Sequence, residues 1–199
     1  MVFSEPIISI DFDRMSEIIV AGSENELRMV DLLHGVLLRK LLINNYHPDL
    51  LFQHCFFARH ADDVLYSLVK DPEGGNTHLI KWNLSNAETI ERKIPLHNFP
   101  ITAICNSELD DSIGIGTSDV IIKIVDSKDM SIRCEKEQHC FCVNDVAMIE
   151  DNSSLASVGA DGMFGKLDGK APEKKTNALL VAAGVFFSFI AYVVIAFIL

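Results

Sequence analysis

Charge is missing from the last part of this 199-residue sequence, because residues 178–199 contain no Asp, Glu, Lys or Arg. A surface helix needs a polar face, and about 20 apolar residues of helix span the hydrocarbon core of a bilayer. The alternative, a helix buried in a large soluble core, would need more surrounding chain than precedes this segment. We therefore expect a transmembrane helix embedded in a lipid bilayer over 178–199, which takes in Ala178, Phe186, Tyr192 and Leu199.

Basic residues are present before this segment and absent after it. Lys170, Lys174 and Lys175 belong to a short basic linker over 169–177, and no Lys or Arg follows. Basic flanks stay on the cytosolic side of a membrane, so we expect a single-pass protein whose N-terminal domain, residues 1–168, is cytosolic. An apolar span of about 21 to 22 residues with no basic segment after it favours the endoplasmic reticulum membrane over the mitochondrial outer membrane.

Two further absences agree with a cytosolic domain. We expect no secretory signal, because Glu5, Asp11 and Asp13 stand where a signal peptide needs a basic start and an unbroken apolar stretch. Cysteines are few, and the five present are an odd number. This count indicates reduced thiols rather than a disulfide framework.

Positive charge is also scarce, with 17 Lys and Arg against 28 Asp and Glu and a formal net charge of -11. Because the expected membrane segment is uncharged, the whole negative excess belongs to the remaining residues. An acidic surface repels the phosphate backbone of nucleic acids. We therefore expect protein partners and no nucleic acid.

What the sequence does contain is a repeated pattern of short apolar runs separated by turn-forming residues. Each run is rich in β-branched residues, and the gaps hold residues such as Asp, Asn and Gly, which is typical of strands joined by tight turns. The pattern predicts strands at 7–12, 18–23, 27–32 and 36–38, at 64–69 and 79–84, at 101–104, 112–117 and 121–126, and at 143–148, 155–161 and 164–168.

The spacing of these copies predicts the type of β-fold. In each copy the third strand closes with an acidic or amide residue, and these four residues follow one another at steps of 52, 43 and 42. WD-repeat blades recur every ~40 to 45 residues, and Trp82-Asn83 comes nearest to the WD dipeptide. An unrelated antiparallel sandwich, the alternative, would not keep this spacing. The predicted blade signature consists of Asp31, Trp82, Asn83, Asp126, Asp161 and Asp168.

We therefore expect an all-β, WD-repeat β-propeller over residues 1–168, with about four blades visible. Four blades are at the low end for a closed propeller, and an open arc of four leaves sheet edges and apolar faces bare. We expect this chain to be part of a larger propeller, a short isoform, or an arc that a partner completes.

No residue set in the sequence makes a strong case for enzymatic chemistry. Gly114-Ile115-Gly116 resembles a phosphate-binding loop, but no helix follows it, so we interpret it as a strand entering its turn. The run His-Cys-Phe-Cys at 139–142 lacks a second pair of zinc ligands, and we interpret its cysteines as buried positions on one face of a strand. The acidic pairs at 62–63 and 110–111 fit solvated turns. We expect a binding platform rather than an enzyme, with no cofactor and no metal.

The sequence from His139 onward resembles one family of WD-repeat proteins. It reads HCFCVNDVAM at 139–148 and LASVGAD at 155–161, and the single apolar span follows. This is similar to the prolactin regulatory element-binding protein family, the membrane-bound guanine nucleotide exchange factors of COPII coat assembly. Before His139 the similarity is generic to WD repeats.

The resemblance implies that the chain loads GTP onto the small GTPase that starts COPII vesicle budding in endoplasmic reticulum to Golgi transport. One departure matters. In that family a glycine-rich N-terminal loop, which holds a potassium ion, engages the GTPase, and no such run precedes Ile7. Residues 74–75, both Gly, lie in the wrong repeat. No catalytic residue is therefore assigned, and the alternative is a tail-anchored WD-repeat scaffold without exchange activity that recruits coat or tethering proteins.

Overall fold

The computed structural model describes residues 3–43, 50–59, 61, 63–73, 75–85, 89–107, 112–149 and 153–169, without the side chains of 89–94. The chain divides into one unit over Met1–Gly169 and a second over Lys170–Leu199. Within the described part, no helix is both long and apolar enough to cross a bilayer. Apart from Gly169, the predicted linker lies outside the described residues, as does the predicted membrane span. The residues outside include Lys170, Lys174, Lys175, Ala178, Phe186, Tyr192 and Leu199.

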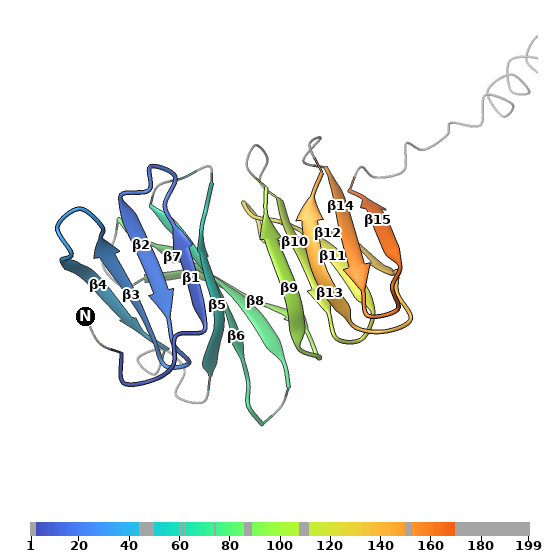
Figure 1. The fold of residues 1–199 in the computed structure, drawn as a ribbon, viewed down its shortest axis with the longest axis horizontal. Helices are drawn as coiled ribbons and strands as arrows, with labels where there is room; N and C mark the ends of the chain where they lie inside the picture. The colour runs from blue at the N-terminus through green and yellow to red at the C-terminus, as the bar shows by residue number, and fades with distance from the viewer. Residues whose placement is uncertain are drawn as a thin grey trace, which may run out of the picture. The chain divides into compact units, whose positions relative to one another are not determined.

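The described residues form four antiparallel sheets that follow one another in chain order (Figure 1). In each sheet, strands that are neighbours in sequence are paired, so every sheet is a simple meander. We name the sheets blades 1 to 4. Blade 1 contains β1 (Ser9–Phe12), β2 (Ile18–Gly22), β3 (Glu26–Asp31) and β4 (Leu37–Leu42), and blade 2 contains β5 (Leu51–Phe57), β6 (Val64–Lys70), β7 (Thr77–Asn83) and β8 (Thr89–His97). Blade 3 contains β9 (Ile101–Asn106), β10 (Ser112–Thr117), β11 (Ile121–Asp126) and β12 (Ile132–Glu137), and blade 4 contains β13 (Val143–Met148), β14 (Ser154–Gly159) and β15 (Phe164–Asp168).

Tight turns connect the strands and hold them in register. The Asp13 carboxylate accepts hydrogen bonds from the backbone N–H groups of Glu17 and Ile18 at 2.8 and 2.9 Å, which closes the turn between β1 and β2. Gly35 and Gly162 lie in two other turns with φ of +64° and +73°. A residue with a side chain rarely adopts this backbone conformation, so glycine suits both positions.

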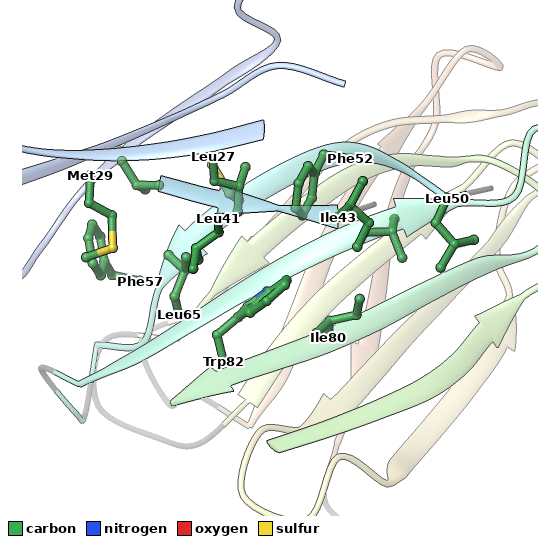
Figure 2. Packing of buried hydrophobic residues seen from close by; sticks show 13 residues of the cluster. Leu27, Met29, Leu41, Ile43, Leu50, Phe52, Phe57, Leu65, Ile80 and Trp82 are labelled. Atoms are coloured by element: carbon green, nitrogen blue, oxygen red, sulfur yellow. The ribbon is translucent and has the colours of Figure 1, made fainter. Parts of the chain in front are cut away.

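The hydrophobic core lies between the sheets rather than within any one of them. The first cluster joins blades 1 and 2, and Figure 2 shows the Trp82 side chain pointing into it from β7. The second cluster joins blades 2 and 3 around Tyr66 and Ile113, and the third joins blades 3 and 4 around Ile124 and Leu155. An inner blade is therefore buried on both faces. For this reason β6 is a nearly continuous run of buried residues instead of an alternating one.

The prediction of an all-β fold with four repeated sheets is confirmed. The predicted strands 112–117, 121–126, 143–148 and 164–168 coincide with β10, β11, β13 and β15. The sequence pattern misses β5, β8 and β12. Strand β12 reads IRCEKE and is mostly exposed, because it is the outermost strand of its sheet and has no apolar pattern to reveal it.

Two glycines of β10 allow blade 4 to approach blade 3 closely. A Cβ atom on Gly114 would collide with the Leu155 side chain and lie 2.7 Å from the sulfur of Cys105. A Cβ atom on Gly116 would lie 2.5 Å from Cγ1 of Val143. The Gly-Ile-Gly run is thus a strand that enters its turn, as predicted, and its glycines leave room for the neighbouring blade.

The substitution Gly114→Ala tests this close approach. Forcing a methyl group against Leu155 overpacks the interface, so we expect the free energy of unfolding to fall by about 1–3 kcal/mol. The measurement is urea unfolding of the full chain in detergent, followed by the fluorescence of the single tryptophan, Trp82. Ile132→Ala, at a residue 42% exposed on β12, is the control and should change little. Equal stability of the two variants would contradict the packing role.

Candidate functional site

Three residues of the predicted blade signature close a strand and hold the turn that follows. The side-chain oxygens of Asp31, Asn83 and Asp126 each accept a hydrogen bond from a backbone N–H two or three residues later, at 2.8 to 2.9 Å. Asp168 closes β15 and accepts a hydrogen bond of 3.0 Å from the hydroxyl of Ser154. These residues lie in four different blades, so the structure distributes them along the repeats and does not gather them into one site.

Trp82, the fifth signature residue, is a core residue that also makes a buried hydrogen bond. Its ring is 1% exposed and packs near Phe52, with 6.3 Å between ring centroids. The indole Nε1–H donates a hydrogen bond of 2.8 Å to the hydroxyl of Ser67, which is itself fully buried. The burial of the ring indicates a structural role for Trp82 between blades 1 and 2.

Asp161, the sixth signature residue, is the centre of a polar cluster at the end of blade 4. Both oxygens of its carboxylate lie 3.2 Å from Nδ1 of His139. The other nitrogen of the His139 ring, Nε2, lies 2.8 Å from the hydroxyl of Ser157. A carboxylate can only accept, so Nδ1–H donates to Asp161 and, in a neutral ring, Nε2 accepts from Ser157. The His139 side chain is fully buried and that of Asp161 is 7% exposed.

Backbone groups complete this cluster. The N–H of Cys140 donates to Asp161 at 2.8 Å, and the N–H of Met163 donates at 2.9 Å. These two backbone hydrogen bonds, together with His139, lower the pKa of Asp161. The carboxylate thereby fixes the loop before β13 to the turn between β14 and β15.

The same pairing occurs one repeat earlier. Nε2 of His97 lies 2.6 Å from the carboxylate of Asp119, and the two residues are 22 positions apart, as are His139 and Asp161. Each residue of the later pair follows its counterpart by 42 positions, which is the step between the third and fourth copies of the strand pattern. The strand pattern of the sequence predicts no role for His97, His139 or Asp119, although the spacing of 22 positions in two successive repeats is a signal that can reveal these pairs.

The prediction that residues 139–142 form part of a strand is wrong. They lie in the loop between β12 and β13, with Cys140 exposed and Cys142 partly buried. The reason is that the His139 ring turns inward to bond Ser157 and Asp161, which takes this segment out of the strand geometry. Among the described residues, no group of three or more His, Cys, Asp and Glu side chains is placed to hold a metal ion.

An ion pair connects the innermost strands of blades 1 and 2. The Asp11 carboxylate accepts a hydrogen bond from the backbone N–H of Phe57 and pairs with the Arg59 guanidinium, both at 2.9 Å. Arg59 also donates to the carbonyl oxygen of Phe12 at 2.9 Å. The Arg59 guanidinium is thus neutralised by Asp11 and hydrogen-bonded to the carbonyl oxygen of Phe12, so Arg59 joins the two blades.

A small cavity opens beside this ion pair. It has a volume of about 180 Å³ and its polar lining includes His54 and Asn106. Nδ1 of His54 lies 3.0 Å from the hydroxyl of Ser9, and burial lowers the pKa of His54. The Asn106 side chain donates to the carbonyl oxygen of Phe57 at 2.9 Å. These groups are engaged with neighbouring blades, so the cavity lacks an activated nucleophile or a free acid–base pair.

The four meander sheets are similar to parts of solved β-propellers. The β-propeller domain of Cps50 (Swd1) from Myceliophteria thermophila superposes with a TM-score of 0.62 at 14% identity, over 88% of this chain and 55% of that one. The computationally designed Ika4 protein superposes with a TM-score of 0.62 at 20% identity, over 84% of this chain and 93% of that one. The fold is that of a β-propeller. No protein-family model and no curated protein sequence matches the chain.

The propeller fold was predicted from the repeat spacing, and the similarity to the Swd1 propeller domain agrees with it. The chain spans about half of that propeller domain. Identities of 14% and 20% establish the fold alone. A fold of this kind hosts many functions, so the function has to be argued from particular surfaces and sites.

Replacing Asp161 by Asn tests the polar cluster of blade 4. Because the folded-state pKa of Asp161 is lowered, its stabilisation is complete above the unfolded pKa of about 4 and is lost as the pH falls through the lower folded value. We expect the wild type to unfold at higher temperature than Asp161→Asn at pH 7, and the difference to shrink below pH 4. Thermal unfolding of the full chains, measured by circular dichroism from pH 7 to 2.5, gives this difference. A constant difference over that range would contradict the role of the charge.

Thiol reactivity tests the burial of the cysteines, all five of which are free. Burial raises the pKa of Cys55 to about 12 and that of Cys105 to about 11, whereas Cys140 is exposed. Since the thiolate is the reactive form, we expect iodoacetamide at pH 8 to label Cys140 first and to reach Cys55 and Cys105 only in denaturant. Peptide mass mapping over time gives the order. Early labelling of Cys55 would contradict the buried interface between blades 1 and 2.

Proposed function

We propose that this chain is a protein-binding propeller, held at the endoplasmic reticulum membrane by residues 178–199, that promotes nucleotide exchange on the small GTPase of COPII assembly. The observation that carries the proposal is the combination of a propeller fold with the sequence from His139 to the apolar tail, which resembles that exchange-factor family. The acidic composition, with a net charge of -11, favours a protein partner over nucleic acid.

Exchange of this kind requires no bond chemistry from the propeller. A surface that binds the nucleotide-free GTPase more tightly than the loaded form shifts the population toward the empty state, from which GTP then binds. The GTPase would bind to the faces and loops of the propeller. The polar clusters around Asp11 and Asp161 are not offered to it, because they join strands and blades. Attachment to a membrane would confine both proteins to one surface and raise their effective concentration.

Release of labelled GDP from the budding GTPase tests this function. The full chain is reconstituted in liposomes, and fluorescent GDP is chased with excess GTP. We expect release to accelerate by about tenfold or more, which corresponds to a barrier lowered by roughly 1.4 kcal/mol. Liposomes that carry residues 170–199 alone are the control and should leave the rate at its intrinsic value.

The second candidate function is a tail-anchored scaffold that recruits coat or tethering proteins without exchange activity. The observation in its favour is the acidic composition, with a net charge of -11, which favours protein partners without implying nucleotide exchange. The same liposomes distinguish the two functions, because a scaffold would retain coat proteins on the membrane at an unchanged rate of GDP release. Accelerated release would rule out the scaffold as the sole function.

A further inference from the structure

One turn of blade 1 exposes a run of apolar side chains. It connects β3 to β4, and within it Leu33 and Val36 are 86% and 54% exposed. Residues 32–38, which read LLHGVLL, contain no Asp, Glu, Lys or Arg. Single apolar residues are scattered over the surface of most soluble proteins, whereas a continuous exposed patch marks a contact with a partner or a membrane.

The turn at the same position of blade 3 has the same backbone. In blade 1 the N–H of Asp31 donates to the carbonyl oxygen of Val36 at 2.9 Å, and in blade 3 the N–H of Asp126 donates to that of Ser131 at 2.8 Å. The fifth residue of each turn has a positive φ, of +64° in blade 1 and +57° in blade 3. The two turns can therefore be compared residue by residue.

This comparison shows that the fold does not require the apolar side chains. Leu33 and Val36 stand where blade 3 has Lys128 and Ser131, and these two polar residues are exposed. Blade 3 packs against a neighbouring blade on each of its two faces. Leu33 and Val36 would thus remain exposed even with a further blade packed against blade 1.

A second turn of blade 1 extends the apolar surface. The N–H of Leu32 donates to the carbonyl oxygen of Glu17 at 2.9 Å, which places the turn between β1 and β2 beside the turn between β3 and β4. Met15, in the turn between β1 and β2, is 68% exposed. A hollow of about 560 Å³ borders both turns, and Glu17 and Leu33 contribute to its lining. The exposed apolar side chains therefore come from two adjacent turns on one rim of the blade.

The chain leaves blade 4 on the same rim. Asp168 ends the third strand of blade 4 as Asp31 ends the third strand of blade 1. Figure 1 shows β2 and β14 pointing in the same direction, and β3 and β15 run antiparallel to them, so β3 and β15 end on one rim. Residues 170–177 then precede the predicted membrane span, and eight residues reach at most about 30 Å. The rim with the apolar turn is therefore the one tethered to the predicted membrane.

The charged groups of the two turns leave the apolar side chains uncovered. The Asp31 carboxylate accepts hydrogen bonds from the backbone N–H and the ring of His34, each at 2.9 Å. The Asp13 carboxylate accepts from backbone N–H groups of its own turn. Arg14 and Glu17 are exposed and have opposite signs. Both aspartates are thus engaged by their own turns, and the surface beside Leu33 has no excess of one charge.

We propose that the turn of blade 1 over residues 32–36, with Met15 beside it, enters the interfacial layer of the membrane that holds the chain. The inference rests on the membrane attachment of the proposed function and extends it, because a second contact fixes which rim faces the lipid. Apolar surfaces that bind in this layer reach about 5–10 Å into the boundary between headgroups and acyl chains. The net charge of -11 gives no attraction to anionic lipids, so apolar burial drives the contact.

Quenching of tryptophan fluorescence by brominated lipid tests the proposal in the full chain, reconstituted in phosphatidylcholine vesicles. The single tryptophan of the wild type, Trp82, is 1% exposed and gives a constant background. Leu33→Trp adds a second ring in the apolar turn. When the phosphatidylcholine carries bromine in its acyl chains close to the headgroup, we expect the added emission to fall by about twofold or more.

Two control variants show whether the contact is specific to this turn. Lys128→Trp places the ring at the equivalent position of the blade 3 turn. Phe141→Trp places it in the loop before β13, on the opposite rim, at a residue 63% exposed. We expect brominated lipid to leave the added emission of both controls unchanged. Equal quenching of Lys128→Trp and Leu33→Trp, or quenching of Phe141→Trp, would contradict the proposal.

Flotation of the same vesicles separates this proposal from the membrane attachment itself. A chain that floats with the vesicles while Leu33→Trp stays unquenched would keep the attachment and refute the contact of the turn. A chain that does not float would refute both. If added GTPase, and not lipid, protects the ring of Leu33→Trp from iodide, the turn binds a protein, which also overturns the proposal.

A charged version of the turn gives a second test. Leu32→Asp and Val36→Asp are combined with Leu33→Trp, at positions 42% and 54% exposed in the wild type, and circular dichroism checks that the fold is retained. Two carboxylates beside the ring resist transfer out of water, so we expect the quenching of the added emission to disappear. Quenching that persists in a folded variant would contradict insertion of the turn through its apolar side chains.

Discussion

Packing between neighbouring sheets is the interaction on which the rest of this structure depends, because a single four-stranded meander has two faces and no interior. Each of the three apolar clusters draws its residues from two consecutive blades. The Trp82 side chain fills the space between blades 1 and 2. The glycines of β10 have no side chain and so leave room for residues of blade 4. Ile10, Phe12, Val158 and Phe164, which remain exposed on strands, belong to blades 1 and 4, each of which has a neighbouring blade on one side only within the described part.

Polar side chains form hydrogen bonds and ion pairs that join strands within a blade and join neighbouring blades. Asp11 joins blades 1 and 2 through a backbone N–H and a guanidinium, and the Tyr66 hydroxyl donates to the carbonyl oxygen of Ser127 between blades 2 and 3. Asp161 holds a loop to a turn within blade 4. The Asp11, Tyr66 and Asp161 side chains are thereby paired, as buried polar groups in a layered core generally are. The same contacts hold these side chains in place between and within the blades.

Much of the fold could be predicted from the sequence, and the reasons for success and failure differ by strand. Strands β10 and β11 are bounded by clear turns and consist of buried β-branched residues, so their limits were recovered. Strand β12 is exposed and charged, and pairing with β11 decides its conformation. His139 was misplaced because its inward turn depends on Ser157 and Asp161, which local pattern cannot show. The proposed function depends on a surface and a partner, and a single sequence does not show which residues a partner contacts.

Every apolar cluster is shared by two consecutive blades, so the stability of each blade depends mainly on its immediate neighbours, as in a linear array of repeats. Blades 2 and 3 each contribute to two apolar clusters, whereas blades 1 and 4 contribute to one. In such arrays the free energy of local opening follows the number of neighbours, so opening begins at the ends and advances inward. Amide hydrogens of β6 and β10 would then exchange with solvent more slowly than those of β2 and β14. Whatever covers the two outer faces would act as a cap, converting the two ends of the array into interior units.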